Sequence, residues 1–278
     1  MPQRPEDIVG EIEKKHLLDL FRKKKIRQDG RSFNETRPLT IEVNCIKKAE
    51  GSAKATLGQS LAVAGVKMEL GEPFPDTPDM GVLIINSELS PIASPTLESG
   101  PPTKESIEIA RVIDRGMRES HAVALDKLCV VPGGKVWIVF VDIYFIGDSG
   151  NFFDVGSIAT MAALKSTMMP VTKVEKDGTI VKTEETIPLP LNRLAASQTF
   201  VKVEDIILCD PDLMEERIAE ARFTCAFTEE GRLCAVQKGL NGTFKRDEIM
   251  EMIRTGQQKS LERIAHIKEN SVDTNHVF

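Results

Sequence analysis

The sequence predicts an α+β fold in which groups of strands alternate with single helices along 278 residues. Strand-like segments, with an apolar residue at every second position, occur in groups. Each group is followed by a longer segment whose apolar residues recur at helical spacing. The order is strands then helix, strand then helix, and strands then helix, which indicates two related halves. We therefore expect a helical arm at residues 1–27, a first half at 28–190 and a second half at 191–278.

The first predicted element is a helix from Asp7 to Lys25. Basic residues gather at its C-terminal end, over Arg22–Lys25, where the helix dipole favours positive charge. We interpret this run as a solvated helix end. Gly30 ends the segment. The apolar stripe of this helix consists of Ile8, Ile12, Leu17 and Leu18.

Four strands are predicted next, because short alternating or branched apolar runs are bounded by glycine and proline. The segment Gly71–Met80 contains three prolines and is expected to be a loop between the third and fourth strands. The proline-rich segment Pro91–Pro102 follows them as a long irregular connection. The four strands are Leu39–Cys45, Ser52–Leu57, Leu61–Met68 and Val82–Leu89.

A second helix is expected to begin after Thr103, whose hydroxyl can cap the first turn, and to run to about Leu125. Val136–Ile146 is then expected to be a buried strand. A third helix should start near Asn151 and end at Met168. The apolar face of the second helix comprises Ile109, Val112, Ile113, Met117 and Ala124.

The remaining residues predict more strands and a closing helix. Asp177-Gly178, between two short extended runs, is typical of a type I′ hairpin turn. The closing helix is expected from Arg246 to about Lys268. The strands before it are Phe200–Val203, Ile206–Leu208, Ala219–Thr228 and Leu233–Lys238.

The composition, 41% hydrophobic and 28% charged, is that of a globular protein. The longest apolar run, Val136–Ile146, is too short to span a bilayer, and Met1–Gly10 contains no signal-peptide core. Five cysteines without a C-x-x-C pair indicate neither disulfides nor a zinc site, so we expect buried thiols and a reducing cytoplasm. The net charge of -6 argues against wholesale coating of nucleic acid, so any such contact needs a local basic patch or a partner.

Carboxylates and histidines are the candidates for metal chemistry. The densest acidic group could hold a divalent cation, as in a metal-dependent hydrolase. The favoured interpretation is that Asp210-Pro211 opens a turn and the acids after it begin a short helix. The four histidines show no metal-ligand spacing and are expected on the surface. The acidic group consists of Asp210, Asp212, Glu215 and Glu216.

The turn Gly147–Asn151 joins a predicted buried strand to a predicted helix. Backbone N–H groups at such a turn can bind a phosphate oxygen. The turn carries no arginine or lysine, and Phe152 and Phe153 follow it. The favoured interpretation is a glycine-rich turn capped by aspartate or asparagine.

Three arginines on the second helix form the most informative basic pattern. Arg111, Arg115 and Arg118 are spaced at i, i+4 and i+7, so they line one stripe of the helix. Guanidinium groups at this spacing can bond successive backbone phosphates. The alternative is a salt-bridged exposed face, in which Asp114 pairs with Arg111 or Arg118 and Glu119 with Arg115. Helix periodicity alone favours neither interpretation.

Several segments, taken in order, resemble motifs of the ribonuclease PH family. The resemblance covers nearly everything from Arg27 to the last helix. The order and spacing of the motifs are more specific than any one of them. They are R-x-D-G-R…R-P at Arg27–Arg31 and Arg37-Pro38, G-S-A…G-x-[ST] at Gly51–Ala53 and Gly58–Ser60, the D-x-G turn with its alanine-rich helix at Asp148–Leu164, and the exosome-type C-terminal segments at Asp210–Glu216 and Thr228–Gly239.

The resemblance implies the ribonuclease PH fold, with two related β/α halves of the ribosomal protein S5 domain 2-like kind. Active members of the family are phosphate-dependent 3′-to-5′ exoribonucleases. In them inorganic phosphate attacks the terminal phosphodiester and releases a nucleoside diphosphate.

The sequence departs from the active members at two positions. Phe152 stands where they place the arginine that binds the attacking phosphate. Arg222 stands where they carry an acidic residue. An enzyme without a phosphate ligand and an acid loses most of its transition-state stabilisation. We therefore expect no catalytic residue, no cofactor and no metal in this chain.

What remains is similar to the inactive subunits that alternate with a catalytic ribonuclease-PH-like homologue in the hexameric ring of the archaeal exosome. The similarity implies that partner, RNA-binding cap proteins and single-stranded RNA as binding partners. Arg111 and Arg115 match the helix that carries RNA-binding arginines in such subunits, and Arg118 is a third candidate. The helical arm is expected to pack on the neighbouring subunit or toward the cap. The alternative is that the chain is itself an active phosphate-dependent exoribonuclease.

Overall fold

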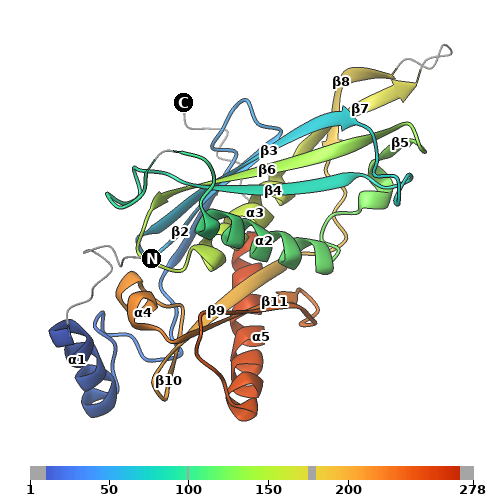
Figure 1. The fold of residues 1–278 in the computed structure, drawn as a ribbon. Helices are drawn as coiled ribbons and strands as arrows, with labels where there is room; N and C mark the ends of the chain where they lie inside the picture. The colour runs from blue at the N-terminus through green and yellow to red at the C-terminus, as the bar shows by residue number, and fades with distance from the viewer. Residues whose placement is uncertain (1–10, 99, 175–179, 270–278) are drawn as a thin grey trace.

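The computed structural model describes residues 11–98, 100–174 and 180–269, which fold into four layers (Figure 1). A large sheet forms the first layer, helices α2 (Lys104–Glu119) and α3 (Phe152–Ser166) the second, a smaller sheet the third and helix α5 (Arg246–Glu269) the fourth. The predicted α+β class is confirmed, and so is the succession of strand groups and helices.

The large sheet has the strand order β1-β2-β3-β6-β4, with β5 paired to β6. Its pairs are antiparallel except for β4 and β6, which run parallel and leave β4 at an edge. Along the central strands β2, β3 and β6 alternate side chains, such as Ala64, Val139 and Val141, are buried against the helix layer. The strands are β1 (Leu39–Val43), β2 (Gly51–Leu57), β3 (Ser60–Gly71), β4 (Val82–Leu89), β5 (Cys129–Val131) and β6 (Lys135–Gly147).

Helix α2 begins as the sequence predicts but ends earlier. The Thr103 hydroxyl accepts a hydrogen bond from the Ser106 backbone N–H at 3.1 Å, as an N-cap should. The helix ends at Glu119 instead of Leu125 because His121 adopts a left-handed conformation, with φ of 52°. The backbone N–H of the next residue bonds back to the Met117 carbonyl at 3.1 Å, which is the hydrogen bond of a Schellman motif. A short 3₁₀ turn, η3 (Leu125–Leu128), follows.

The smaller sheet is antiparallel and has the order β10-β9-β11-β12. Its central strand β9 starts at Ala195, ahead of the predicted start at Phe200. The extra residues include Ser197, Gln198 and Thr199, which are buried and hydrogen-bonded but lack the apolar alternation that identifies a strand. The strands are β9 (Ala195–Val203), β10 (Ile206–Cys209), β11 (Ala221–Thr228) and β12 (Leu233–Gly239).

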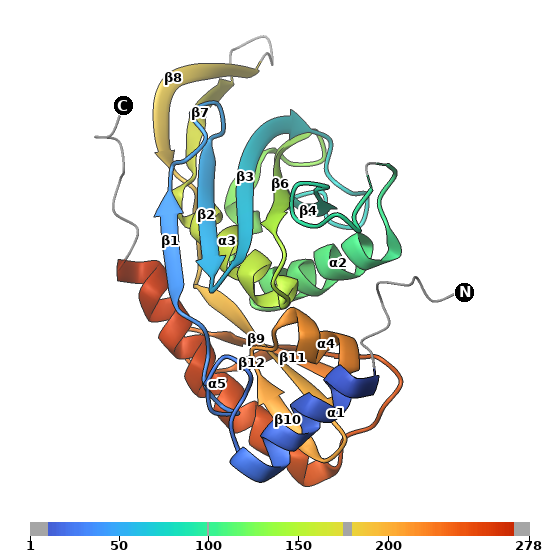
Figure 2. The same ribbon diagram turned by 90° about the vertical axis from the view of Figure 1, so that its left-hand side faces the viewer.

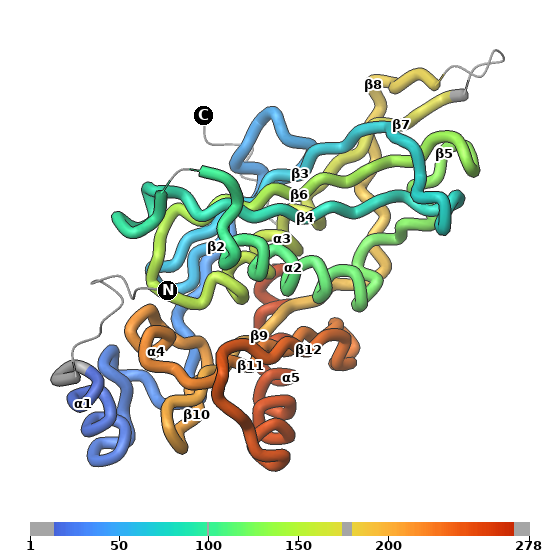
Figure 3. The backbone as a smooth tube through the Cα atoms, viewed as in Figure 1, coloured from blue at the N-terminus to red at the C-terminus, as the bar shows by residue number. Residues whose placement is uncertain are grey.

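Helix α3 lies between the two sheets and packs on both of them (Figure 2). It ends at Ser166, because Met168 already pairs with Pro188 in a two-stranded hairpin. This hairpin, β7 (Met168–Val174) and β8 (Ile180–Pro188), projects from the body of the molecule (Figure 3). The antiparallel pairing agrees with the predicted hairpin, and its Asp177-Gly178 turn lies outside the described residues.

The N-terminal arm packs on its own chain. It is described as α1 (Glu11–Asp19) and a π-helical turn, η2 (Leu20–Lys24); the predicted start at Asp7 lies outside the described residues. Leu17 and Phe21 are buried in a cluster with apolar residues of the second half and α4 (Leu213–Ile218). That the arm also packs on a neighbouring subunit or toward the cap stays a prediction. That cluster contains Val201, Val203, Ile206, Leu208 and Ile218.

The structure shows how far the cysteines and histidines are buried. The thiols of Cys209 and Cys225 are buried, but Cys45 is exposed, so the expectation of buried thiols is only partly correct. The described histidines, His16, His121 and His266, are exposed as expected. Among the described helices none is both long and apolar enough to cross a membrane.

Candidate functional site

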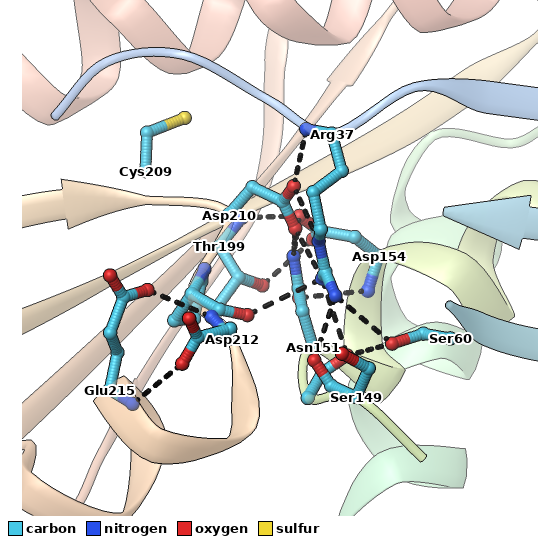
Figure 4. Close-up of polar contacts among 12 residues, drawn as sticks. Arg37, Ser60, Ser149, Asn151, Asp154, Thr199, Cys209, Asp210, Asp212 and Glu215 are labelled. Atoms are coloured by element: carbon cyan, nitrogen blue, oxygen red, sulfur yellow. Dashed lines mark hydrogen bonds and ion pairs between the residues drawn. The ribbon is translucent and has the colours of Figure 1, made fainter. Parts of the chain in front are cut away.

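A buried cluster of arginines and carboxylates joins the segment before β1 to the second half of the chain, and Figure 4 shows the part of it around Arg37 and Asp210. The guanidinium of Arg37 donates to the Asp210 carboxylate at 2.7 and 3.0 Å, and the Arg37 backbone N–H adds a third bond at 2.8 Å. Arg31 donates to the same carboxylate at 3.1 Å. Arg27 forms a two-bond ion pair with Glu215, in which both side chains are completely buried.

Burial alone would raise the pKa of Asp210, but the hydrogen bonds and charge of Arg37 outweigh it and lower that pKa to about 2. The carboxylate is therefore ionised at neutral pH and serves as the anchor for three donors on Arg37. The arginines of the opening motif and the acids of the Asp210–Glu216 segment are thus structural partners, although 173 residues separate Arg37 from Asp210.

The acidic segment has its carboxylates committed to the protein. Asp212 caps α4, where its carboxylate accepts from the Glu215 backbone N–H and the Glu215 carboxylate accepts from the Asp212 backbone N–H, each at 2.9 Å. Glu216 accepts a hydrogen bond from the Asn151 backbone N–H at 3.0 Å. Within the described residues no group of three or more potential ligands is placed to hold a metal ion. The interpretation as a turn and helix start is confirmed.

The turn Gly147–Asn151 is held by the protein itself. Asn151 has a left-handed φ of 58° and caps α3. Its backbone N–H is used by Glu216, and its side-chain amide donates to Asp154 at 2.7 Å and to Asp210 at 2.6 Å. Figure 4 shows Arg37 reaching the same turn, where it donates to the Ser149 carbonyl at 2.7 Å. The preferred interpretation, a capped turn, is confirmed.

A cavity of about 270 Å³ lies beside this turn, between α2, α3 and β11. Phe152 packs on Phe145, with ring centroids 4.5 Å apart. The guanidinium of Arg222 lies 4.0 Å from the centre of the Phe153 ring and forms an ion pair with Glu108 of α2. Phe152 and Arg222, the two positions at which the resemblance predicts a departure from active family members, therefore line one cavity.

Carboxyl side chains line that cavity together with the two phenyl rings. Burial raises the pKa of Glu216 to about 8 and also raises the pKa of Asp148. Glu105 lines the same wall. Arg217 is the exposed cation at the rim, whereas Arg222 is paired with Glu108. Phenyl rings and carboxyl groups supply no positive charge to bind a phosphate dianion.

The predicted arginine stripe is exposed on α2, but its three members differ. Arg118 donates to Asp114 at 2.7 Å and to the Leu83 carbonyl at 2.9 Å, so the salt-bridged alternative holds for this residue. Arg115 donates to Gln237 at 3.1 Å and makes no ion pair with Glu119. Within the described part of the chain Arg111 makes no hydrogen bond or ion pair. Its guanidinium is therefore available to a ligand.

Arg111 lies between two grooves. The larger, of about 450 Å³, runs between α2 and the edge strand β4. The smaller, of about 270 Å³, is lined by Arg111 together with Lys104, Arg115 and Gln237. Sequence reasoning missed Lys104, although its position seven residues before Arg111 places it on the same helix face. Gln237 comes from β12, and no local pattern could have placed it there.

The fold and these sites have clear relatives. The chain matches the 3′ exoribonuclease family, with domain 1 of the family at residues 35–170 and domain 2 at residues 194–259. The chain belongs to this family, and the expected ribonuclease PH fold is confirmed.

Among its relatives is the exosome complex component Rrp42 of Methanothermobacter thermautotrophicus, which is 45% identical over 264 residues, or 95% of this chain and 97% of that protein. A chain of the Archaeoglobus fulgidus exosome with RNA bound to the active site has a TM-score of 0.83 and 41% identity, covering 91% of this chain and 96% of that one. A chain of an archaeal exosome core has a TM-score of 0.83 and 38% identity, covering 95% of this chain and 100% of that one. The expected likeness to archaeal exosome subunits is confirmed.

Proposed function

We propose that this chain is a non-catalytic subunit of an archaeal-type exosome ring. It scaffolds a catalytic ribonuclease-PH-like partner, with which it alternates in a hexameric ring, and it contributes to the grip on single-stranded RNA during 3′-to-5′ phosphorolysis. RNA-binding cap proteins complete the complex, which acts in the cytoplasm. The relatives named as exosome components support the assignment to the ring.

One observation carries the non-catalytic role. Phe152, Phe153 and Arg222 line one cavity, and the resemblance implies that active members carry a phosphate-binding arginine at the position of Phe152 and an acid at that of Arg222. Arg222 cannot replace a general acid, because a guanidinium does not give up its proton in proteins and this one is paired with Glu108. The phenyl rings and carboxyl groups of the lining supply no positive charge for the attacking phosphate.

A second observation supports the RNA-binding role. Arg111, Arg115 and Lys104 line one exposed groove on a chain whose net charge is -6. A local cluster of cations on an acidic protein can bind the RNA backbone where the rest of the surface repels it. Arg118, paired with Asp114, is the weakest member of the set.

The test is a comparison of the isolated chain with the chain co-expressed with a catalytic homologue. The isolated chain should release no nucleoside diphosphate from oligoadenylate and inorganic phosphate, whereas the heteromer should release it. Light scattering should give a stable heteromer, consistent with an interface of roughly 2,000 Å² or more. Phosphorolysis by the isolated chain that is abolished by Glu216→Gln would overturn the proposal, and so would a co-expressed pair that stays monomeric.

A further inference from the structure

Arg222 reaches from the second half of the chain to helix α2. Arg222 lies in β11 opposite Gly239 of β12. A Cβ atom on Gly239 would lie only 2.5 Å from the Arg222 guanidinium, so a larger residue there would displace it. The guanidinium stacks on the Phe153 ring at 4.0 Å and ends at the Glu108 carboxylate. Its side chain is 12% exposed, against 44% for Glu108, so the pair is anchored from the arginine side. A glycine, a phenyl ring and a carboxylate thus hold one arginine in a defined place.

Glu108 is the acidic residue among those that line the basic groove. On α2 it lies four residues after Lys104 and three before Arg111, which are the spacings at which oppositely charged side chains of a helix pair. Without another partner, the Glu108 carboxylate would therefore pair with one of these cations. In the structure the carboxylate pairs with Arg222 instead, and Arg111 has no partner among the described residues.

We propose that Arg222 is a positioning residue for RNA binding: it keeps the Glu108 carboxylate paired with itself and so leaves Arg111 and Lys104 available to RNA phosphates. This inference rests on the proposed function, because it requires the groove to bind RNA. Arg222 itself does not touch RNA in this mechanism. The arginine that replaces an acidic residue of active family members thus gains a role of its own in the non-catalytic subunit.

The experiment measures the affinity of the assembled ring for single-stranded oligoadenylate. The variants are Arg222→Met, which keeps an apolar contact with Phe153 and removes the charge, and Arg222→Lys, which keeps the charge beside Glu108. Arg222→Met should weaken binding by about three- to tenfold, the effect expected when one phosphate is no longer neutralised. Arg222→Lys should bind nearly as the wild type does.

The double variant Arg222→Met/Glu108→Gln decides the mechanism. It should recover the affinity of Glu108→Gln alone, because the released carboxylate is absent. If the double variant stays as weak as Arg222→Met, Arg222 acts on RNA directly or through the fold, and the inference is overturned. Unchanged binding by Arg222→Met overturns it as well. The variant Arg111→Glu/Arg115→Glu tests separately whether the groove binds RNA at all. If this variant also binds RNA with wild-type affinity, the groove does not hold RNA, and it is the RNA-binding part of the proposed function that is wrong.

Discussion

At the scale of single residues, the arginines of the family's opening motif are structural. Arg27, Arg31 and Arg37 are buried and reach Asp210 and Glu215, so they tie the segment before β1 to the segment around the start of α4. A buried ion pair is not by itself evidence of net stability, because desolvation costs nearly as much as the attraction returns. Removing one partner is nevertheless costly, because it leaves the other charge buried and unpaired.

Asp210→Asn should therefore destabilise the chain by about 3–5 kcal/mol at neutral pH. Because the pKa of Asp210 is lowered to about 2, its contribution is fully present above the unfolded-state pKa of about 3.9 and is lost as pH falls toward 2. Urea unfolding at a series of pH values should show the gap between wild type and variant shrinking below about pH 4.

The control is Asp76→Asn, in an exposed loop position, which should change stability by less than about 0.5 kcal/mol. A gap between wild type and Asp210→Asn that stays constant down to pH 2 would contradict the ionised, arginine-paired state of this carboxylate.

At the scale of elements, α2 has a buried apolar face and an exposed basic face. Ile109, Ile113 and Met117 are buried in the main core. Arg111 and Arg115 are exposed on the other side. Substitutions on the exposed face should therefore change the affinity for RNA and leave the fold intact.

Arg111→Glu/Arg115→Glu should weaken RNA binding by the assembled ring roughly tenfold or more near physiological salt. The loss should be the same for oligoadenylate and oligouridylate, because phosphate contacts carry little sequence information. The slope of log affinity against log salt should flatten by about 0.7 for each RNA phosphate that the variant no longer neutralises.

The matched control is Arg254→Glu, an exposed arginine on α5 at the far side of the smaller sheet. It should assemble and bind RNA with the wild-type slope. If the α2 variant assembles and shows the same affinity and slope as this control, the stripe is only a surface of the scaffold.

At the scale of the whole molecule, the two sheets share the layer of helices between them. The main core unites α3 and the large sheet with Leu194 and Ala196 of the second half and with Ile264 and Ile267 of α5. The buried ion pair of Asp154 and Arg263, at 2.8 Å, links α3 to α5 across β9. The predicted boundary between residues 190 and 191 stays a prediction, and the shared core implies that neither side of it is complete alone.

We therefore expect a single cooperative unfolding transition, with equal calorimetric and van't Hoff enthalpies. A fragment of residues 191–278 should lack a cooperative transition, since it loses α3 from one face of β9. Two separate transitions in calorimetry, or a cooperatively folding fragment, would show that the halves are independent.

The sequence alone determined the α+β class, most strands, the N-cap of α2 and the basic stripe, because periodicity, capping and turn chemistry are written in short windows of residues. The prediction misplaced the end of α2, because His121 takes a left-handed conformation there. It also misplaced the start of β9, because the buried polar residues at that end of the strand have a composition typical of loops. RNA contact by Arg111, Arg115 and Arg118 stays a prediction.

Only the tertiary structure decided which charges meet. It paired Arg37 with Asp210, 173 residues away, and Arg222 with Glu108, 114 residues away, and it placed the helical arm on its own second half. An ion pair depends on a distance of a few ångströms between side chains, and no local pattern encodes that distance for residues so far apart in the chain. That Arg111 has no partner among the described residues was likewise visible only in the folded chain, whereas its place on the helix face follows from the sequence.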